Sequence, residues 1–354
     1  MKVYILPADP YGCGHYRLIW PANVLQQMGH EIVIMPPNRD SGFMARMVER
    51  DDGTQALTGL RIPADADVIV LQRPSHPLQP DMIKMIRANG IAVVVDMDDD
   101  MSSIHPDNIA FHLYRPTSTS PFSWRHALES CKEATLVTTS TRLLQKVYAK
   151  HGRGQVLDNF VPAAYLDFPK SDAGTFGWAG TTKSHPNDLQ ITGTAVQKLI
   201  NEGHPFQVVG GKSKVKECLR LNTAPAVTGS IPLVDYVRHI AEHLDVGMVP
   251  LAPTSFNTSK SRLKGIEYMS VGVPWVGSPR EEYRRLHRES GCGLLADTPK
   301  DWYSKLKLLI TDDVLRKEQA EAGREFMKGQ TYQANAWRWW EAWTRALDIE
   351  RGSS

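Results

Sequence analysis

Short runs rich in Val and Ile, each followed by a helix-like pattern, recur in two successive parts of the 354-residue chain. Strands that are covered on both faces of a parallel sheet have near-continuous apolar sequences of this kind. The first series comprises residues 2–6, 31–35, 67–72, 91–96 and 135–140, and the second comprises residues 175–180, 206–211, 226–229, 245–251 and 273–278. Alternation of such strands with helices predicts two α/β domains that follow one another along the chain.

A segment containing Pro169 and Asp172 separates the two series, so we expect the first domain to cover residues 1–168 and the second residues 169–330. The remaining residues, 331–354, include the run WRWWEAWTRAL that begins at Trp337. An aromatic platform for stacking nucleic-acid bases is one interpretation of this run. Large apolar side chains at helical spacing favour the other interpretation, a packed amphipathic helix.

Composition excludes few functions. A hydrophobic content of 42%, a charged content of 23% and a mean hydropathy of -0.33 describe a soluble globular protein. The net charge of +2 neither requires nor excludes a nucleic-acid partner. Four cysteines lie far apart and form no C-x-x-C pair, which indicates reduced thiols and argues against a zinc site. With neither a secretory signal nor a membrane-spanning run in the sequence, we expect a cytoplasmic protein without stable membrane insertion.

The segment FNTSKSRLKGIEYMSVGVPWVG, residues 256–277, has the pattern of a polar loop that runs into a helix. Lys260 and Ser261 precede the helix, and a helix N-terminus offers unpaired N–H groups and a positive dipole end to an anion. A diphosphate at this point would meet backbone donors and a cation together. Glu267, one or two turns later, is placed to accept hydrogen bonds from sugar or ribose hydroxyls. The segment therefore predicts a site for a nucleotide sugar.

Two further segments carry candidate residues. Gly12 and Gly14 predict either a close approach of the backbone to a ligand or simply a tight strand-to-helix turn. Carboxylates cluster in DMDDD, residues 96–100, where they could bind a hard cation, orient acceptor hydroxyls, act as a base or cap a helix. The Pro-rich stretch 101–125 that follows predicts a long loop that contacts substrate.

Four segments carry a resemblance to a known family: YGCGHYRLIWPANVLQQMGHEI, VVVDMDDDM, FGWAGTTKSHPNDL and FNTSKSRLKGIEYMSVGVPWV. They resemble, in order along the chain, the glycine loop and first helix, the D-x-D-D segment, the first strand and loop of the second domain, and the donor loop of GT-B glycosyltransferases. The similarity is strongest to the family 4 type and to its variant group in phage and bacterial genomes. It implies an α/β fold with two facing Rossmann-like domains and a C-terminal helix, residues 331–354, that crosses back to the N-terminal domain.

The resemblance also implies a division of labour between an N-terminal acceptor domain and a C-terminal donor domain. Glu267 matches the second glutamate of the family's E-x7-E pattern and would hold the nucleotide ribose, whereas Ser259 stands where the first glutamate should be. The residues expected in the site are, for catalysis, Asp98, Asp99 and Lys260; for the donor, Gly12, Gly14, Arg17, Gly180, Thr181, Lys183, His185, Asn257, Ser261, Lys264 and Glu267; and for the acceptor, Asp96, Asp100 and His105.

The expected function is transfer of a sugar from a nucleotide-diphosphate donor, with UDP or GDP as the nucleotide, to an acceptor hydroxyl. The resemblance implies that no metal or other cofactor is required and that the anomeric configuration is retained. The acceptor could be a glycan, a protein, a lipid or a modified DNA base. Two alternatives are a non-catalytic module that binds nucleotide sugars and a D-x-D phosphohydrolase. The nucleophile of such hydrolases sits on the first strand, however, whereas Asp96 follows about the fourth by our count.

Overall fold

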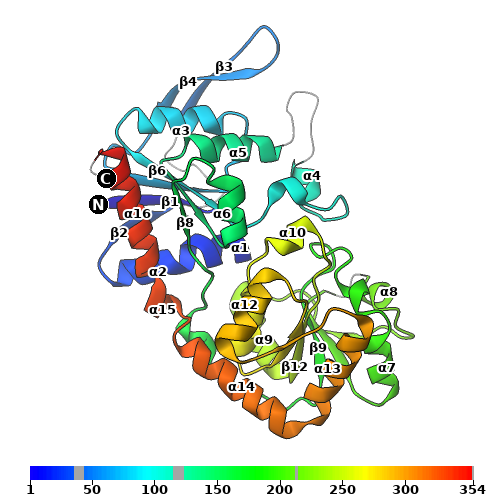
Figure 1. The fold of residues 1–354 in the computed structure, drawn as a ribbon. Coiled ribbons are helices and arrows are strands. Elements are labelled where there is room, and N and C mark those ends of the chain that lie inside the picture. Colours follow the sequence, from blue (N-terminus) through cyan, green and yellow to red (C-terminus); the bar gives the residue numbers. More distant parts are fainter. Residues whose placement is uncertain (36–43, 115–122, 212–213, 353–354) are drawn as a thin grey trace.

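The computed structural model describes residues 1–35, 44–114, 123–211 and 214–352, and these form two lobes, one above the other in Figure 1. The N-terminal lobe holds a parallel sheet in the order β2 (Glu31–Ile34), β1 (Lys2–Leu6), β5 (Val68–Gln72), β6 (Ala92–Met97), β7 (Leu136–Thr139) and β8 (Gly154–Val156). Every residue of β5, β6 and β7 is buried. Their continuous apolar sequences therefore reflect a sheet that is covered on both faces.

Helices connect these strands, beginning with a short turn after β1 that leads into α2 (Trp20–Gln27). The others are α3 (Gln79–Arg87), α4 (Phe111–Tyr114), α5 (Ser123–Glu133) and α6 (Arg142–Tyr148). The stretch expected as one long loop, 101–125, thus contains a 3₁₀ turn at Met101–Ser103, α4 and the start of α5, while residues 115–122 lie outside the described ranges.

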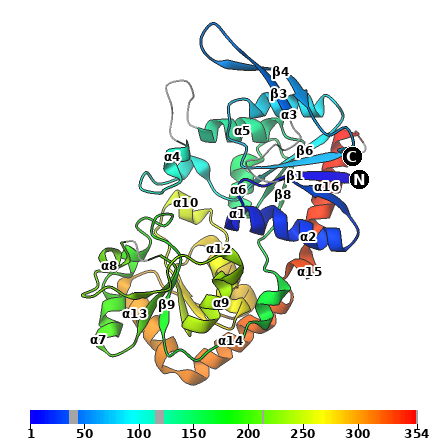
Figure 2. The ribbon, with the colours of Figure 1, turned by 180° about the vertical axis from the view of Figure 1, so that it is seen from behind.

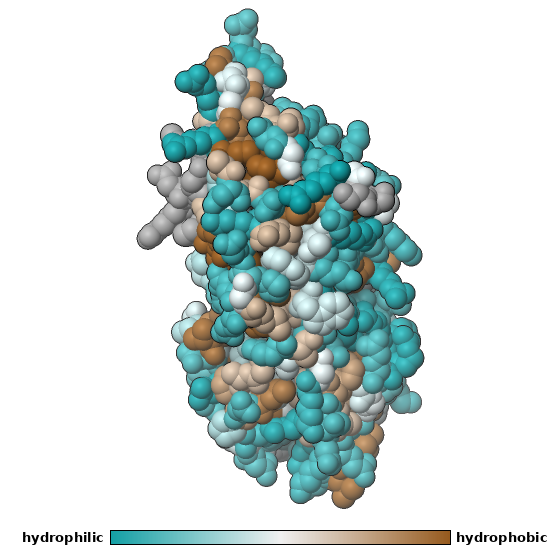
Figure 3. Space-filling model, turned by 90° about the vertical axis from the view of Figure 1, so that its left-hand side faces the viewer, coloured by the Kyte–Doolittle hydropathy of each residue, from teal (hydrophilic) through white to brown (hydrophobic). Residues whose placement is uncertain are grey.

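An antiparallel hairpin was not expected from the sequence. Its strands, β3 (Met44–Glu49) and β4 (Gln55–Arg61), project from the top of the N-terminal lobe. Neither strand has the Val- and Ile-rich sequence that is typical of a sheet interior. The side chains of residues 45–49 in β3 are exposed to solvent, which explains why this strand has no such apolar run. On the side shown in Figure 3, hydrophilic residues prevail, and the largest hydrophobic area lies in the upper lobe beneath the narrow tip.

The C-terminal lobe repeats the architecture with a second parallel sheet, in the order β11 (Ala226–Val227), β10 (Phe206–Val209), β9 (Phe176–Ala179), β12 (Val246–Val249), β13 (Trp275–Gly277) and β14 (Leu294–Leu295). Its helices are α7 (Ala195–Asn201), α8 (Val215–Cys218), α9 (Leu233–His243), α10 (Ser255–Thr258), α11 (Leu263–Ser270), α12 (Glu281–Ser290) and α13 (Pro299–Thr311). The prediction of two α/β domains is confirmed.

The chain passes between the lobes twice. It first descends from β8 to a 3₁₀ turn at Ala163–Asp167, close to the predicted boundary at residue 168. It returns through α14 (Asp313–Lys328), α15 (Tyr332–Asn335) and α16 (Trp337–Glu350), which Figures 1 and 2 show running from the lower lobe to the upper one. The two passages are joined because Val161 N donates to Gln330 O at 3.2 Å and Tyr332 N donates to Val161 O at 3.0 Å.

The returning helix α16 packs on the first sheet, as the resemblance implied. Trp339 and Trp343 are fully buried, and Trp339 Nε1 donates to the carbonyl oxygen of Arg17 at 2.7 Å. Trp340 stacks on His30 with ring centroids 3.8 Å apart, whereas Trp337 is 51% exposed. The packed-helix interpretation of the Trp-rich run therefore holds.

Replacing Trp339 with Ala should lower the free energy of unfolding by about 4 kcal/mol, because it removes a fully buried indole and one buried hydrogen bond. Chemical denaturation measures this change. Trp337→Ala on the same helix is the matched control, and a loss of less than about 0.5 kcal/mol is expected for this exposed position. Equal losses in the two variants would contradict the described packing of α16.

Candidate functional site

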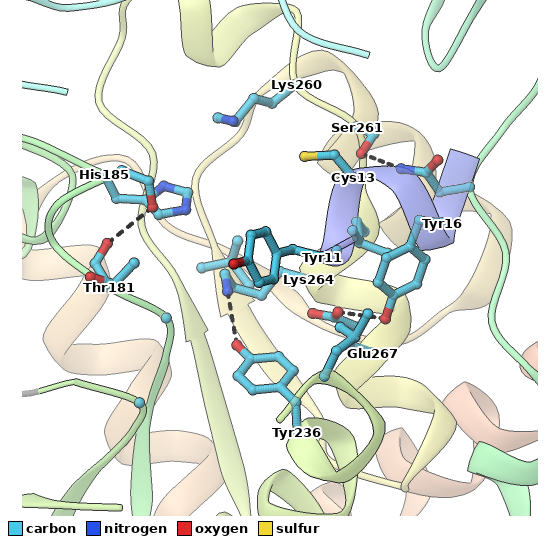
Figure 4. A pocket seen from close by; sticks show the side chains of 18 of the residues that line it. Tyr11, Cys13, Tyr16, Thr181, His185, Tyr236, Lys260, Ser261, Lys264 and Glu267 are labelled. Carbon is cyan, nitrogen blue, oxygen red and sulfur yellow. Dashed lines mark hydrogen bonds between the residues drawn. The ribbon is translucent and has the colours of Figure 1, made fainter. Parts of the chain in front are cut away.

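A cavity of about 510 Å³ lies where the carboxyl ends of the two sheets face each other. The N-terminal lobe contributes the turn after β1 and the segment after β6, and the C-terminal lobe contributes the segments after β9, β10 and β12 together with α9 and α11. Ligands in open α/β sheets bind at these strand ends. Figure 4 shows the cavity with side chains of both lobes around it.

The turn after β1 is a π-helix, His15–Ile19, and it places two neighbouring side chains in different roles. Arg17 is buried and donates from Nε and Nη2 to the carboxylate of Asp96, at 3.0 and 2.8 Å, and from Nη1 to Leu157 O and Asn159 Oδ1. Tyr16 points across the gap and donates from its hydroxyl to Glu267 Oε1 at 2.7 Å. Single π-turns of this kind often mark functional sites.

The acidic segment after β6 is neutralised by cations from both lobes. Arg73, which follows β5 in a left-handed backbone conformation, donates from Nε and Nη2 to Asp98, and its Nη2 lies 3.2 Å from Asp99 Oδ2. Lys260 of the C-terminal lobe donates to Asp99 Oδ1 at 3.1 Å. Burial by itself would raise the pKa of Asp98, but Arg73 outweighs it and holds that pKa below its usual value. Asp98 is therefore a charged carboxylate of low basicity.

Helix α11 contributes a buried carboxylic acid, Glu267, and a partly buried amine, Lys264, to the cavity. Burial raises the pKa of Glu267, although Lys264 and the hydrogen bond from Tyr16 counteract it. Burial lowers the pKa of Lys264, although Glu267 counteracts it. Lys264 Nζ donates to the carbonyl oxygen of Ala179. It also lies 3.5 Å from the hydroxyl of Tyr236, and Figure 4 draws this second contact. Burial thus disfavours the charged form of both groups.

His185 lines the cavity and is oriented by a buried aspartate. Its Nδ1 lies 3.1 Å from Asp188 Oδ2, while Asp188 Oδ1 accepts hydrogen bonds from Ala252 N and Asn257 Nδ2 at 2.9 and 2.6 Å. Burial lowers the pKa of His185, and Asp188 counteracts this only in part. The ring is therefore neutral at pH 7, with Nδ1–H donating to Asp188 and Nε2 left as an acceptor.

Most of the residues expected in the site line the cavity. The described lining includes Gly12, Arg17, Asp98, Asp99, Gly180, Thr181, His185, Lys260, Ser261, Lys264 and Glu267. Their positions agree with the expectation, and their roles in binding or catalysis stay predictions.

Six expected residues do not belong to that described lining, and the structure gives most of them another task. Of the donor residues, Gly14 packs so tightly that a Cβ would come within 2.0 Å of Asp9 O, Asn257 supports Asp188, and Lys183 O accepts a hydrogen bond from Ile109 N. Of the acceptor residues, Asp96 is fully buried against Arg17, Asp100 caps the 3₁₀ turn at Met101–Ser103, and His105 Nε2 lies 3.3 Å from Asn187 Nδ2. Asp100 therefore caps a helical turn, which was one of the alternatives for the acidic cluster.

Several lining residues were missed from the sequence. Tyr16 lies inside a segment that the sequence analysis singled out, and Tyr236 lies on α9, where no motif marks it. Arg73, which pairs with the lining residues Asp98 and Asp99, follows β5 and was missed for the same reason. Tyr11, 72% exposed at the mouth of the cavity, and Cys13 flank Gly12. Burial raises the pKa of Cys13 to about 12, so the thiol stays protonated.

Comparison with known families identifies the second lobe. Residues 173–312 match the family model described as glycosyl transferases group 1. No match was found among curated proteins.

Solved structures with the same overall fold are numerous. Sucrose-phosphate synthase from Thermosynechococcus elongatus is 12% identical with a TM-score of 0.64, over 98% of this chain and 99% of that one. Anabaena HepE in complex with UDP is 13% identical with a TM-score of 0.62, over 98% and 100%. A mutant of S. aureus TarM bound to UDP is 15% identical with a TM-score of 0.55, over 79% of this chain. This chain spans only 55% of TarM's length.

Acid should destabilise the protein partly through His185. Its folded-state pKa lies below the unfolded value of about 6.5, so the unfolded chain binds the additional proton as the pH falls from about 6.5 toward the folded-state pKa. Stability that is present above pH 6.5 is lost across that window. His185→Gln should lose less unfolding free energy than the wild type between pH 7.5 and 5.5 in urea denaturation. His204→Gln, on a turn outside the cavity, should behave as the wild type, and identical pH profiles for all three proteins would refute the assignment.

Proposed function

We propose that this chain moves a sugar from a nucleotide-diphosphate donor to an acceptor hydroxyl. The match of its C-terminal lobe to the family model of glycosyl transferases group 1 and the fold that it shares with glycosyltransferases support the proposal. One observation carries the proposal. Between the carboxyl ends of the two sheets, a buried glutamate and two lysines gather at the start of one helix. The UDP bound to TarM and to HepE supports UDP as the nucleotide.

The donor diphosphate would lie at the N-terminus of α11. Lys260 and Ser261 immediately precede this helix, and Lys264 is in its first turn. Helix N–H groups and cations stabilise the negative charge that grows on a leaving diphosphate. Lys260 donates to Asp99, so binding of the donor would exchange a carboxylate for a phosphate oxygen. Two lysines at this position support a transfer that does not depend on a metal ion.

Glu267 would accept hydrogen bonds from the nucleotide ribose. Its Oε1 already accepts from Tyr16, so the ribose hydroxyls would use the remaining acceptor positions or displace the phenol. Ser259, which stands in place of the family's first glutamate, donates to Phe256 O and is buried. Other groups at the cavity would then recognise the sugar ring. One of them is His185, whose Nε2 could accept a hydrogen bond from a sugar hydroxyl.

We also propose that the transfer retains the anomeric configuration of the sugar. An inverting transfer needs a base to activate the acceptor hydroxyl. Asp98 is poorly suited to that role because Arg73 lowers its pKa, and Asp99 is paired with both Arg73 and Lys260. These pairs support a role in positioning the acceptor. The anomeric configuration of the glycoside product, read from proton NMR coupling constants, distinguishes the two outcomes, and an inverted product would contradict retention.

The acceptor would bind to the N-terminal lobe. A glycan, a protein, a lipid or a modified DNA base is compatible with an acceptor site on the N-terminal lobe. In the part of the chain that the structure describes, no helix has both the length and the apolarity needed to cross a bilayer. The cytoplasmic location stays a prediction from the sequence.

Ser259 also favours a second candidate, a module that binds nucleotide sugars without turnover.

Lys260→Ala should lower kcat for transfer or hydrolysis of a UDP-sugar by about 10²–10³-fold, because it removes a cation from the leaving diphosphate. Glu267→Gln should mainly raise KM through weaker ribose binding. Release of UDP from UDP-sugars, and of GDP from a parallel set of GDP-sugars, measures both effects. Lys146→Ala, an exposed lysine on α6, is the matched control and should be unchanged. Wild-type binding without any turnover would favour the module, and full activity of Lys260→Ala would contradict the assigned diphosphate site.

A further inference from the structure

Helix α9 carries a group of metal-binding side chains outside the cavity. Its last two turns contain His239, Glu242 and His243, which are spaced so that they share one face of the helix. Among the described residues, these three form the group whose possible ligand atoms all lie within 4.8 Å of one another. All three side chains are partly exposed, although the Nδ1 atom of His239 is not.

The geometry is close to that of a coordination site. His239 Nδ1 and Glu242 Oε2 are 3.6 Å apart, and the rings of His239 and His243 lie nearly parallel, with an interplanar angle of 12° and centroids 5.7 Å apart. Zinc binds imidazole nitrogen and carboxylate oxygen at about 2.0–2.2 Å, which puts two ligand atoms of a tetrahedral site roughly 3.4 Å apart. The first pair already meets this requirement, and a rotation of the His243 side chain brings in the third ligand.

An independent observation concerns one atom of this group. His239 Nδ1 is hidden from solvent and has no hydrogen-bond partner. Buried polar atoms in folded proteins nearly always have a partner, so an exception calls for an ion or a water molecule. The atom faces the carboxylate of Glu242 at a distance too long for a hydrogen bond, and a cation placed between the two would satisfy both.

We propose that His239, Glu242 and His243 bind one late first-row divalent cation, of which Zn²⁺ is the representative, with water in the remaining coordination position. Imidazole nitrogens and a carboxylate suit Zn²⁺, Ni²⁺ and Cu²⁺ better than Mg²⁺ or Ca²⁺. The site lies at the C-terminal end of α9, where the helix dipole favours a cation. Two nearby basic side chains are engaged elsewhere: Arg238 lies over the ring of Phe168, and Lys170 pairs with Asp245.

The proposed site is independent of the proposed transferase function. The first half of α9 supplies Leu233 and Tyr236 to the cavity, whereas the metal ligands occupy the other end. That end is tied to the start of the second domain, since Ser171 N donates to Ala241 O and Thr175 Oγ1 donates to His243 O. A bound cation would cross-link the last two turns of the helix and thereby stabilise the folded protein.

The test is a titration of the full-length protein, first dialysed against a chelator, with Zn²⁺ in competition with a chromophoric chelator. The wild type should bind one equivalent, and the double variant His239→Ala/His243→Ala should bind it at least about tenfold more weakly. Cu²⁺ bound to the wild type should show an electron paramagnetic resonance spectrum split by two nitrogen ligands.

Two matched variants keep the test decisive. His204→Ala should bind Zn²⁺ as the wild type does, and Glu242→Gln, which keeps both imidazoles, should bind more weakly and serves if the double variant does not fold. Zn²⁺ should raise the melting temperature of the wild type but not that of the double variant. The proposal is overturned if the wild type takes up no equivalent, or if the folded double variant or Glu242→Gln binds Zn²⁺ as tightly as the wild type.

Discussion

The buried ion pair between Arg17 and Asp96 joins the parts of the molecule that form the cavity. Arg17 uses three nitrogens to bind Asp96 at the end of β6 and to reach Leu157 and Asn159 after β8, and its carbonyl oxygen accepts from Trp339. Asn159 in turn donates to Ser261 Oγ in the C-terminal lobe at 2.9 Å. A charged pair in this position is stable only because every partner is present. The same interaction fixes the π-turn from which Tyr16 reaches Glu267.

Around the cavity the two lobes meet through polar contacts, as is common between domains of one chain. Lys260 to Asp99, Asn159 to Ser261 and Tyr16 to Glu267 all cross the gap, and all involve residues of the cavity wall. A donor that takes over Lys260 and Glu267 would therefore replace contacts between the lobes with contacts to itself.

The sequence predicted the fold well because parallel strands buried on both faces have an unmistakable pattern, and β5, β6 and β9 were all found from it. The hairpin β3–β4 lacks that pattern and was missed. In the site, Lys260, Lys264 and Glu267 could be found because one helix and its preceding loop hold them in sequence order. Arg73 and Tyr236 could not, because their partners lie 25 and 28 residues away and only the folded chain brings them together. Asn257 and Asp96 had suitable chemistry, but hydrogen bonds inside the protein already occupy them.

We propose above that a nucleoside diphosphate binds in the cavity that the two lobes line together. Amide hydrogen exchange of the protein with and without UDP tests it most directly, because it reports each segment separately. We expect UDP to slow the exchange of backbone amides in the turn 11–17 of the N-terminal lobe. In the same sample, amides of residues 260–267 in the C-terminal lobe should also exchange more slowly. No protection by any nucleoside diphosphate, or protection confined to segments outside the cavity, would contradict it.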